Sequence, residues 1–459
     1  MDQDRILYRG EAFTLTGSRL SQDDSHWAEV EKDGRVRTMK NGRYSEWRIV
    51  PETEYGPRYH SGFEVLNKAY CLALNEAGAL INEEGTFRTG ANWPTVWTRD
   101  IAYATHLGLG MWNVQACMKS LQARVRKGEV EQDTGTGGSW PISSDRVVWS
   151  VAAWEAYCLT GDGDWLLQAS RVLEKTCLKD EKVLTATGGL MRGESSFLDW
   201  REQSYPAWMT SADIGDSSSL STMILHAAAR KMLARMFREL GMEGKAREWD
   251  GKGEALSGVI EKFFRIPGSD LYGQYLYGRG YPVLSEKVDS LGNMLCVLLG
   301  HAHGAHAARM VAALPHCVYG IPCFHPQMPE DVAPYHNRAT WPFLEGYYAQ
   351  AAAATGNECG LALALACMVR AALLCGTNKE NLLLETGLDG LLLSSDSQLW
   401  SIAGMLGGFY KGLFGLRVSP DSLEFRPCIP DSFAGVHELS GLQYRGMTVD
   451  ARVSGQGRR

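Results

Sequence analysis

Two carboxylates in aromatic-rich loops are the residues best placed to do chemistry. Asp199 lies between Leu198 and Trp200 in segment 189–209, where charged and aromatic residues alternate. Apolar neighbours keep water from a carboxyl and raise its pKa, which suits a general acid. Glu385 follows an apolar run and precedes a Thr-Gly turn, a reasonable position for a general base. Two carboxylates among aromatic side chains are what cleavage of a glycosidic bond requires.

Each of these carboxylates could also have a purely structural role. Asp199 could form an ion pair with Arg192 or Arg201 and do nothing else. Asp396, which precedes the last expected helix, is a rival to Glu385 for the role of base. Both alternatives stay open at the level of residue types.

Segment 90–104 offers a sugar-binding arrangement. Arg99 and Asp100 open an expected helix directly after Trp97. An Asp in the first helical turn is often no more than compensation for the helix dipole. In the functional interpretation, Arg99 and Asp100 hydrogen-bond vicinal hydroxyl groups while the Trp97 ring stacks on a sugar face.

The other candidate binding residues are polar or aromatic side chains in loops, or in the first turn of the helix that follows a loop. They are Trp140, Trp200, Tyr335, His336, Trp341, Gln398 and Trp400. Anchoring of loops to the core accounts for most aromatic residues of this kind, and a loop histidine is usually only hydrogen-bonded. Asp145, close to Trp140, would serve as a plain N-cap.

Several other chemistries lack their motifs. The chain has no Gly-rich phosphate loop, no GxSxG elbow and no HExxH pair, and its histidine-containing stretch 301–308 is expected at the surface. We therefore expect neither a metal nor a cofactor. The 11 cysteines show no CxxC spacing and the N-terminus no signal-peptide pattern, which predicts free thiols in a cytoplasmic protein.

Composition narrows the possible partners. The chain has 459 residues with 46 Lys+Arg against 53 Asp+Glu, and no basic block, so nucleic acid is not an expected partner. No apolar stretch approaches the roughly 20 residues of a membrane span, so no membrane partner is expected either. A carbohydrate substrate is the expected partner, and the sequence leaves the oligomeric state open.

Helical periodicity begins near residue 62. Apolar residues recurring every 3.6 positions predict twelve helices at 62–79, 99–111, 113–127, 145–159, 162–178, 217–240, 243–264, 285–300, 303–314, 338–355, 358–375 and 397–413. Short Gly-containing turns pair them into hairpins, while the loops between pairs are long and rich in Trp, Tyr, Asp and Glu. Six hairpins in a ring form an (α/α)6 toroid, so the predicted class is all-α with small β segments at both termini. An open stack of hairpins is the alternative, but no fixed-period repeat is present.

Three regions follow from this pattern. Residues 1–60 are predicted as an N-terminal β or extended segment, 61–415 as the helical catalytic domain, and 416–459 as a C-terminal β appendage. The abrupt ending of the appendage is compatible with a longer domain.

The order of four motifs resembles the six-hairpin glycosidases, which include the C-terminal glucosidase domain of glycogen debranching enzymes, trehalases and relatives of processing glucosidase I. The resemblance covers roughly 60–415, and the order and spacing of the motifs are more specific than any one of them. The motifs are W-x-R-D (97–100), E-S-x-x-L-D-W (194–200), Y-H-N-x-x-x-W-P (335–342) and a Glu followed by D-S-Q-L-W-S (385, 396–401).

The resemblance implies an inverting, exo-acting hydrolase that removes an α-linked sugar. It makes Asp199 the general acid and Glu385 the general base, with Arg99, Asp100 and Trp97 around the bound sugar. An inverting enzyme holds its two carboxyls about 6.5–9.5 Å apart, with room for a water molecule.

Two departures from the family pattern keep alternatives open. Arg338 stands where the family has Gly, and the segment after Glu385 lacks the usual His/Pro/Gly-Cys pattern, so Asp396 remains a rival base. A phosphorylase, lyase or sugar isomerase on the same fold, or a non-catalytic carbohydrate-binding protein, are the alternative functions, because a fold does not fix a function.

Overall fold

A computed structural model describes residues 3–52, 56–135, 140–199, 201–278, 280–329, 332, 334–391 and 394–455. Six helices that are buried on most sides form its centre. They contact one another in the cyclic order α2, α4, α8, α10, α13, α15 and back to α2. These inner helices are α2 Thr98–Ala104, α4 Trp149–Thr160, α8 Leu220–Glu239, α10 Ser290–Leu298, α13 Pro342–Thr355 and α15 Leu399–Gly407.

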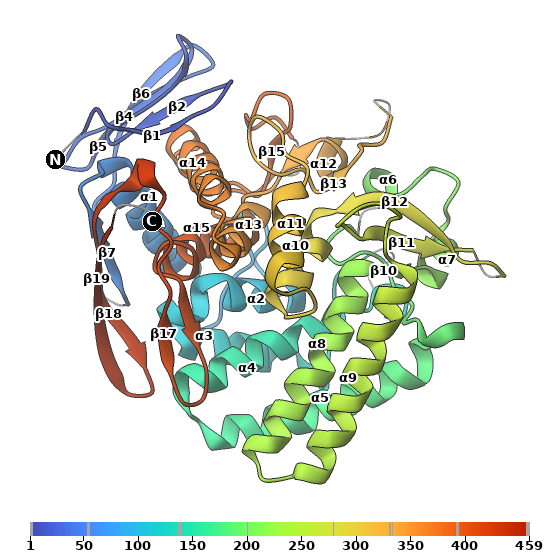
Figure 1. Ribbon diagram of the computed structural model, residues 1–459. Coiled ribbons are helices and arrows are strands. Elements are labelled where there is room, and N and C mark those ends of the chain that lie inside the picture. Colours follow the sequence, from blue (N-terminus) through green and yellow to red (C-terminus); the bar gives the residue numbers. More distant parts are fainter. Residues whose placement is uncertain are drawn as a thin grey trace.

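A second set of helices packs outside the first (Figure 1), and most of them bury one face. In α5, for example, the buried positions recur every three to four residues, as an amphipathic helix requires. The outer helices are α1 Glu64–Ala79, α3 Gly110–Ala123, α5 Gly163–Leu184, α9 Glu243–Phe263, α11 Gly304–Ala313 and α14 Glu358–Cys375. By length and composition α14 could cross a membrane, but most of it is buried inside the molecule.

Short helical segments complete the path between these helices. The α-helical ones are α6 Arg201–Ser204, α7 Ser211–Asp216 and α12 Pro334–Asn337. The π-helical ones, η1 Thr105–Leu109 and η5 Gly408–Leu413, extend α2 and α15. The 3-10 helices are η3 Asp145–Val148, η4 Thr187–Gly189 and η6 Asp431–Phe433.

Glycines let α13 and α15 approach closely. A Cβ atom at Gly346 would lie 2.4 Å from the Cα atom of Gly404, so a larger residue at Gly346 would push the two helices apart. The short distance between these helices brings Trp341 and Gln398, which are their N-cap residues, to the same end of the bundle.

The prediction of an all-α fold with small terminal β segments is wrong. The described chain forms six sheets, and the largest is a six-stranded antiparallel sheet near the N-terminus that packs on α14 (Figure 1). Its strands, in spatial order, are β1 Ile6–Arg9, β2 Thr14–Thr16, β3 Arg19–Asp23, β4 His26–Val30, β5 Arg35–Lys40 and β6 Arg43–Arg48.

The other sheets are smaller, and several form inside segments that the sequence pattern assigned to loops. Most of these strands have only two residues, so they leave no alternating pattern long enough to recognise. They are β8 Val125–Arg126 with β9 Glu129–Val130, β10 Ser218–Ser219 with β11 Gly273–Tyr277, β12 Val283–Asp289 and β13 Phe324–His325, and β14 Ala339–Thr340 with β15 Leu382–Leu383.

The segments that precede and follow the helical bundle meet in one sheet. Strand β7 Arg58–Ser61 pairs with β18 Gly435–Tyr444, which in turn pairs with β19 Met447–Gly455. A hairpin of β16 Leu416–Val418 and β17 Leu423–Phe425 lies between α15 and this sheet in sequence and contacts α4. The segment before the first helix and the segment after the last one are therefore joined by backbone hydrogen bonds.

A buried carboxyl in α13 predicts a pH-dependent stability. Glu345 accepts a hydrogen bond of 2.6 Å from the Ile321 N–H, and its other oxygen has no partner among the described residues. Burial raises the pKa of Glu345 to about 8, so the folded chain holds a proton that the unfolded chain releases near pH 4.5. The free energy of unfolding therefore falls as pH rises from about 4.5 to about 8.

Glu345→Gln is expected to remove this loss. The variant should match the native protein at pH 5 and be more stable at pH 9, by at most about 5 kcal/mol. Urea unfolding at the two pH values measures the difference. An equal effect of the substitution at both pH values would contradict the argument, and the exposed Glu254→Gln serves as the matched control.

Candidate active site

Asp199 is held by a buried arginine. It follows a sharp turn at Phe197, whose φ is 61°, and ends the loop before α6. The Arg99 Nη2 atom donates to Asp199 Oδ2 at 2.7 Å, and Arg99 Nη1 lies 3.6 Å from Asp145 Oδ2. Burial opposes the charge on Arg99, but the carboxylates of Asp199, Asp145 and Asp100 outweigh it and raise the pKa of Arg99. One cation thus binds three carboxylates at the start of α2.

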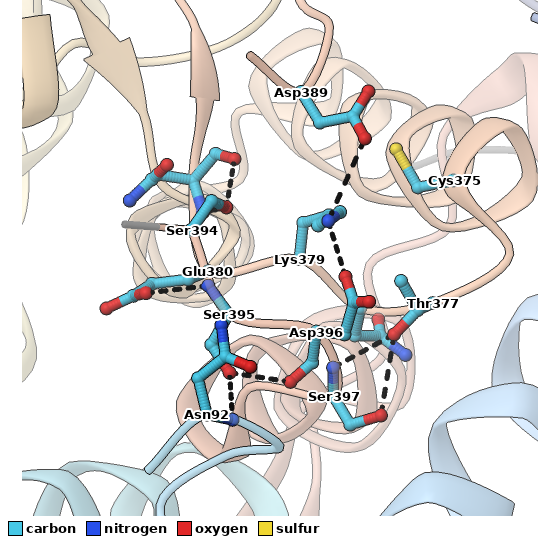
Figure 2. Close-up of polar contacts among 12 residues, drawn as sticks. Asn92, Cys375, Thr377, Lys379, Glu380, Asp389, Ser394, Ser395, Asp396 and Ser397 are labelled. Atoms are coloured by element: carbon cyan, nitrogen blue, oxygen red, sulfur yellow. Dashed lines mark hydrogen bonds and ion pairs between the residues drawn. The ribbon is translucent and has the colours of Figure 1, made fainter. Parts of the chain in front are cut away.

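Glu380 is the second carboxyl at this end of the bundle. It lies just before β15 and is 4% exposed. Its Oε1 atom accepts a hydrogen bond from the Tyr335 hydroxyl at 3.0 Å, and its Oε2 atom accepts from the Ser395 N–H at 2.9 Å and the Trp93 indole N–H at 3.4 Å. Figure 2 shows Glu380 beside Ser395. Three donors from separate segments fix the orientation of this carboxyl.

Asp199 and Glu380 influence each other electrostatically. Burial raises the pKa of Glu380 to about 7, three hydrogen bonds oppose this shift, and the negative charge of Asp199 adds to it. Burial also raises the pKa of Tyr335, and the charges of Glu380 and Asp199 both contribute. Two carboxyls therefore act electrostatically on the same Tyr335 side chain and on each other.

Aromatic rings form a wall beside these carboxyls. The Phe197 ring meets the rings of His336, Trp341 and Trp400 edge to face, with centroids 5.3–6.2 Å apart. The His336 imidazole stacks on Trp341 at 5.0 Å, and its Nδ1 atom lies 2.9 Å from the Ser204 hydroxyl. Burial, with a smaller contribution from Arg99, lowers the pKa of His336, so the ring is neutral. All four side chains are buried, so they form a rigid aromatic cluster beside the two carboxyls.

Several buried polar atoms at this end of the bundle have no hydrogen-bond partner among the described residues. A native protein rarely leaves such atoms unsatisfied, so groups of them mark places where a ligand or water binds. They are Arg99 Nε, Asp100 Oδ2, Ser195 Oγ, Gln398 Oε1 and Trp400 Nε1. Burial also raises the pKa of Asp100 well above its usual range, which favours a carboxyl that can donate a hydrogen bond.

The structure brings most of the sequence-predicted site residues together. Arg99, Asp100, Asp199, Tyr335, His336, Trp341, Gln398 and Trp400 belong to the contacts described above. The Trp97 ring lies 5.4 Å from the ring of Trp93, which is bonded to Glu380. Trp200 lies outside the described residues.

Glu385 and Asp396 have different surroundings from Glu380. The Glu385 side chain is 43% exposed and forms an ion pair with Arg338. The Asp396 side chain is 55% exposed and forms an ion pair with Lys379, which also lies near Asp389 (Figure 2). Both carboxyls are thus half exposed and paired with a cation, whereas Glu380 is buried beside the aromatic wall.

Trp140 is likewise engaged elsewhere. Its indole N–H donates to Asp180 Oδ1 at 2.9 Å, and the Arg146 guanidinium and the Lys179 ammonium lie over its ring. This cluster connects the loop before α4 to α5, so the contacts of Trp140 are those of a structural anchor.

Sequence reasoning missed Glu380 and Trp93 as contributors to the site. Glu380 stands in the polar run 377–381, directly after the apolar helix α14 and at the start of the last long loop. A carboxyl at the start of the long loop that leads to the last helix was the available signal. Within the described ranges no three His, Cys, Asp or Glu side chains gather as a metal site would need.

Comparison with known proteins places the fold. No protein-family model and no curated protein sequence matches the chain. A structure named "Sialidase" superimposes with a TM-score of 0.67 at 15% identity over 88% of this chain. A GH78 family rhamnosidase of Bacillus sp. GL1 gives 0.59 at 14% over 90%, and a bacterial glucoamylase complexed with acarbose gives 0.55 at 15% over 75%.

These structures are much longer than the chain, which covers 39% of the sialidase, 42% of the rhamnosidase and 55% of the glucoamylase. At such low identity the likeness concerns the fold alone. The chain shares the fold of glycoside hydrolases.

Proposed function

We propose that the protein hydrolyses a glycosidic bond with Asp199 and Glu380 as its two catalytic carboxyls. The observation that carries the proposal is the pair itself: two buried carboxyls in different environments, both acting on Tyr335, beside an aromatic wall. Hydrolysis of a glycoside requires such a pair. The fold shared with glycoside hydrolases supports the proposal.

In this proposal Asp199 is the general acid and Glu380 the general base. The three hydrogen-bond donors around Glu380 orient its carboxylate, and a pKa of about 7 makes it a stronger base than an exposed glutamate. The Arg99 guanidinium, which donates to Asp199 Oδ2 at 2.7 Å, holds the carboxyl of Asp199 in position. Glu380 then takes a proton from water, and Asp199 protonates the leaving oxygen.

We further propose the inverting, exo-acting cleavage of an α-linked sugar that the sequence resemblance implies. Water activated by Glu380 attacks the anomeric carbon on the face opposite the leaving group, so the product has the inverted configuration. Arg99, Asp100, Gln398 and the Trp400 indole N–H offer polar atoms to the hydroxyl groups of the bound sugar.

A leaving-group experiment tests the pair and the two roles. NMR on a panel of α-linked glucosides, mannosides and rhamnosides in phosphate-free buffer first identifies the substrate and the anomer released. Aryl glycosides of the same sugar with an acidic phenol need little protonation, so Asp199→Asn should regain most of its rate on them. Glu380→Gln should stay inactive on both substrates.

Each possible result of this experiment supports a different conclusion. The opposite pattern, with Glu380→Gln rescued by the acidic phenol, would exchange the two roles. Native-like rates in both variants, or no turnover of any glycoside by the native protein, would overturn the hydrolase proposal. Turnover that requires added phosphate would identify a phosphorylase.

The pKa of Glu380 predicts the acid limb of the pH profile. Because the base must be ionised, kcat/KM should rise with pH until about 7, with about a tenfold loss per pH unit below it. Tyr335→Phe removes a donor that stabilises the carboxylate, so the limb should move to higher pH, by about one unit. A pH–rate profile of the two proteins measures this, and an unmoved limb would contradict Glu380 as the titrating base.

A further inference from the structure

A cavity lies at the end of the inner helices that is opposite to the candidate active site. Its volume is about 330 Å³, near the lower end of the roughly 300–1,000 Å³ typical of ligand sites. The inner helices that carry Arg99, Trp341 and Gln398 at their beginnings contribute residues from their far ends here. The lining residues that matter for the argument are Trp154, Glu155, Arg235, Lys411, Arg417 and Arg426.

The cavity has a surplus of positive charge. Lys411 Nζ lies 2.7 Å from Glu155 Oε2, and Arg426 Nη2 lies 2.7 Å from Glu424, so these cations are neutralised. Arg235 and Arg417 also line the cavity, and neither forms an ion pair with a described residue. Burial, together with the nearby Arg426, lowers the pKa of Arg417, and Glu424 on the paired strand, which forms an ion pair with Arg426, only partly opposes this shift.

Glu155 adds an acceptor to the same cavity. The residue is 5% exposed, and its Oε1 atom has no hydrogen-bond partner among the described residues. A buried oxygen without a donor costs free energy, so a ligand with an O–H group would stabilise it. Trp154, the residue before Glu155 in the chain, also lines the cavity. Its partly buried ring offers an apolar face.

We propose that this cavity binds an organic anion of about one sugar ring that carries hydroxyl groups. Its oxyanion pairs with Arg235 and Arg417, a hydroxyl donates to Glu155 Oε1, and an apolar face lies against Trp154. The carboxylate of a sugar acid and the phosphate of a sugar phosphate share this chemistry. The site is separate from Asp199 and Glu380 and does not depend on the proposed hydrolysis.

Calorimetric titration of the whole protein tests the proposal, with glucuronate, glucose 6-phosphate, glucose and inorganic phosphate as probes. At least one of the two sugar anions should bind, and glucose should bind about tenfold more weakly or not at all. The double variant Arg235→Gln/Arg417→Gln should weaken the anion by about 10- to 100-fold. Both arginines are exposed, so their loss should not disturb folding.

Three control variants show whether the anion binds in this cavity. Arg238→Gln removes an exposed cation of the same helix that pairs with Asp250 outside the cavity, and should leave the affinity unchanged. Glu155→Gln also frees Lys411 from its ion pair, so it should strengthen the binding of inorganic phosphate more than that of the sugar anion, whose hydroxyl loses its charged acceptor. Glu380→Gln should not alter the binding. No binding of either sugar anion up to about 10 mM, or equal affinity in the double variant, would overturn the proposal.

Discussion

Glu380→Gln should reduce hydrolysis by about 10³-fold or more while leaving the protein folded. General base catalysis contributes roughly 10²–10⁴-fold, and an amide cannot accept the proton of the attacking water. Gln can keep its amide oxygen toward the Ser395 and Trp93 N–H groups while its NH2 group donates to the Tyr335 hydroxyl oxygen, so the loop should keep its position. Single-turnover rates and urea unfolding of the same samples measure the two effects.

The stability of this variant distinguishes a catalytic role from a structural one. Burial raises the pKa of Glu380 to about 7 from an ordinary value of 4.5, so the ionised form costs the folded protein stability above pH 7. Glu380→Gln removes that cost and should raise the free energy of unfolding at pH 8 by about 3 kcal/mol at most. Lost activity with raised stability is typical of a catalytic carboxyl.

Glu385→Gln is the matched control. The substitution has the same chemistry at an exposed ion pair with Arg338, and it should change hydrolysis and stability little. If Glu385→Gln loses hydrolysis and Glu380→Gln does not, the base is the residue that the sequence resemblance implies.

The long helices could be predicted because their signal is local. The expected ranges 217–240, 243–264 and 358–375 nearly coincide with α8, α9 and α14, since apolar positions that recur every 3.6 residues report burial of one face. The same rule fails over 285–300, where the structure has β12 up to Asp289 and only then α10. Pairing of β12 with β11 and β13 decides this segment, and β13 lies more than 30 residues further along the chain.

The candidate site shows a similar division. Asp199, Arg99 and Tyr335 could be selected from sequence because they stand among aromatic residues where helices begin. The choice between Glu380 and Glu385 could not be made in this way, because both stand in one short segment of the last long loop. The Glu380 N–H donates to the Ser395 carbonyl, and the next residues form β15, which pairs with β14. These contacts between segments far apart in the chain orient Glu380, and the local sequence does not reveal them.

Arg99→Met should destabilise the protein by about 3–5 kcal/mol at neutral pH. Arg99 is 5% exposed and is the cation beside Asp199, Asp145 and Asp100. Removal of one partner from a buried ion pair leaves uncompensated charge, which is the costly case. The carboxyls in the variant have raised pKa values when folded, so the deficit should be smaller at pH 5 than at pH 8.

The stability lost in Arg99→Met shows whether Arg99 acts through its charge on the neighbouring carboxyls or only through the packing of its side chain. A second substitution, Asp199→Asn, removes one of the unpaired charges and should restore part of the stability lost in Arg99→Met. Arg192→Met, at a half-exposed residue 3.8 Å from Asp216, should cost no more than about 0.5 kcal/mol. Urea unfolding of the four proteins at both pH values measures the coupling. If Arg99→Met proves as mild as Arg192→Met, or its deficit does not depend on pH, then the buried ion pair between Arg99 and Asp199 does not stabilise the folded site.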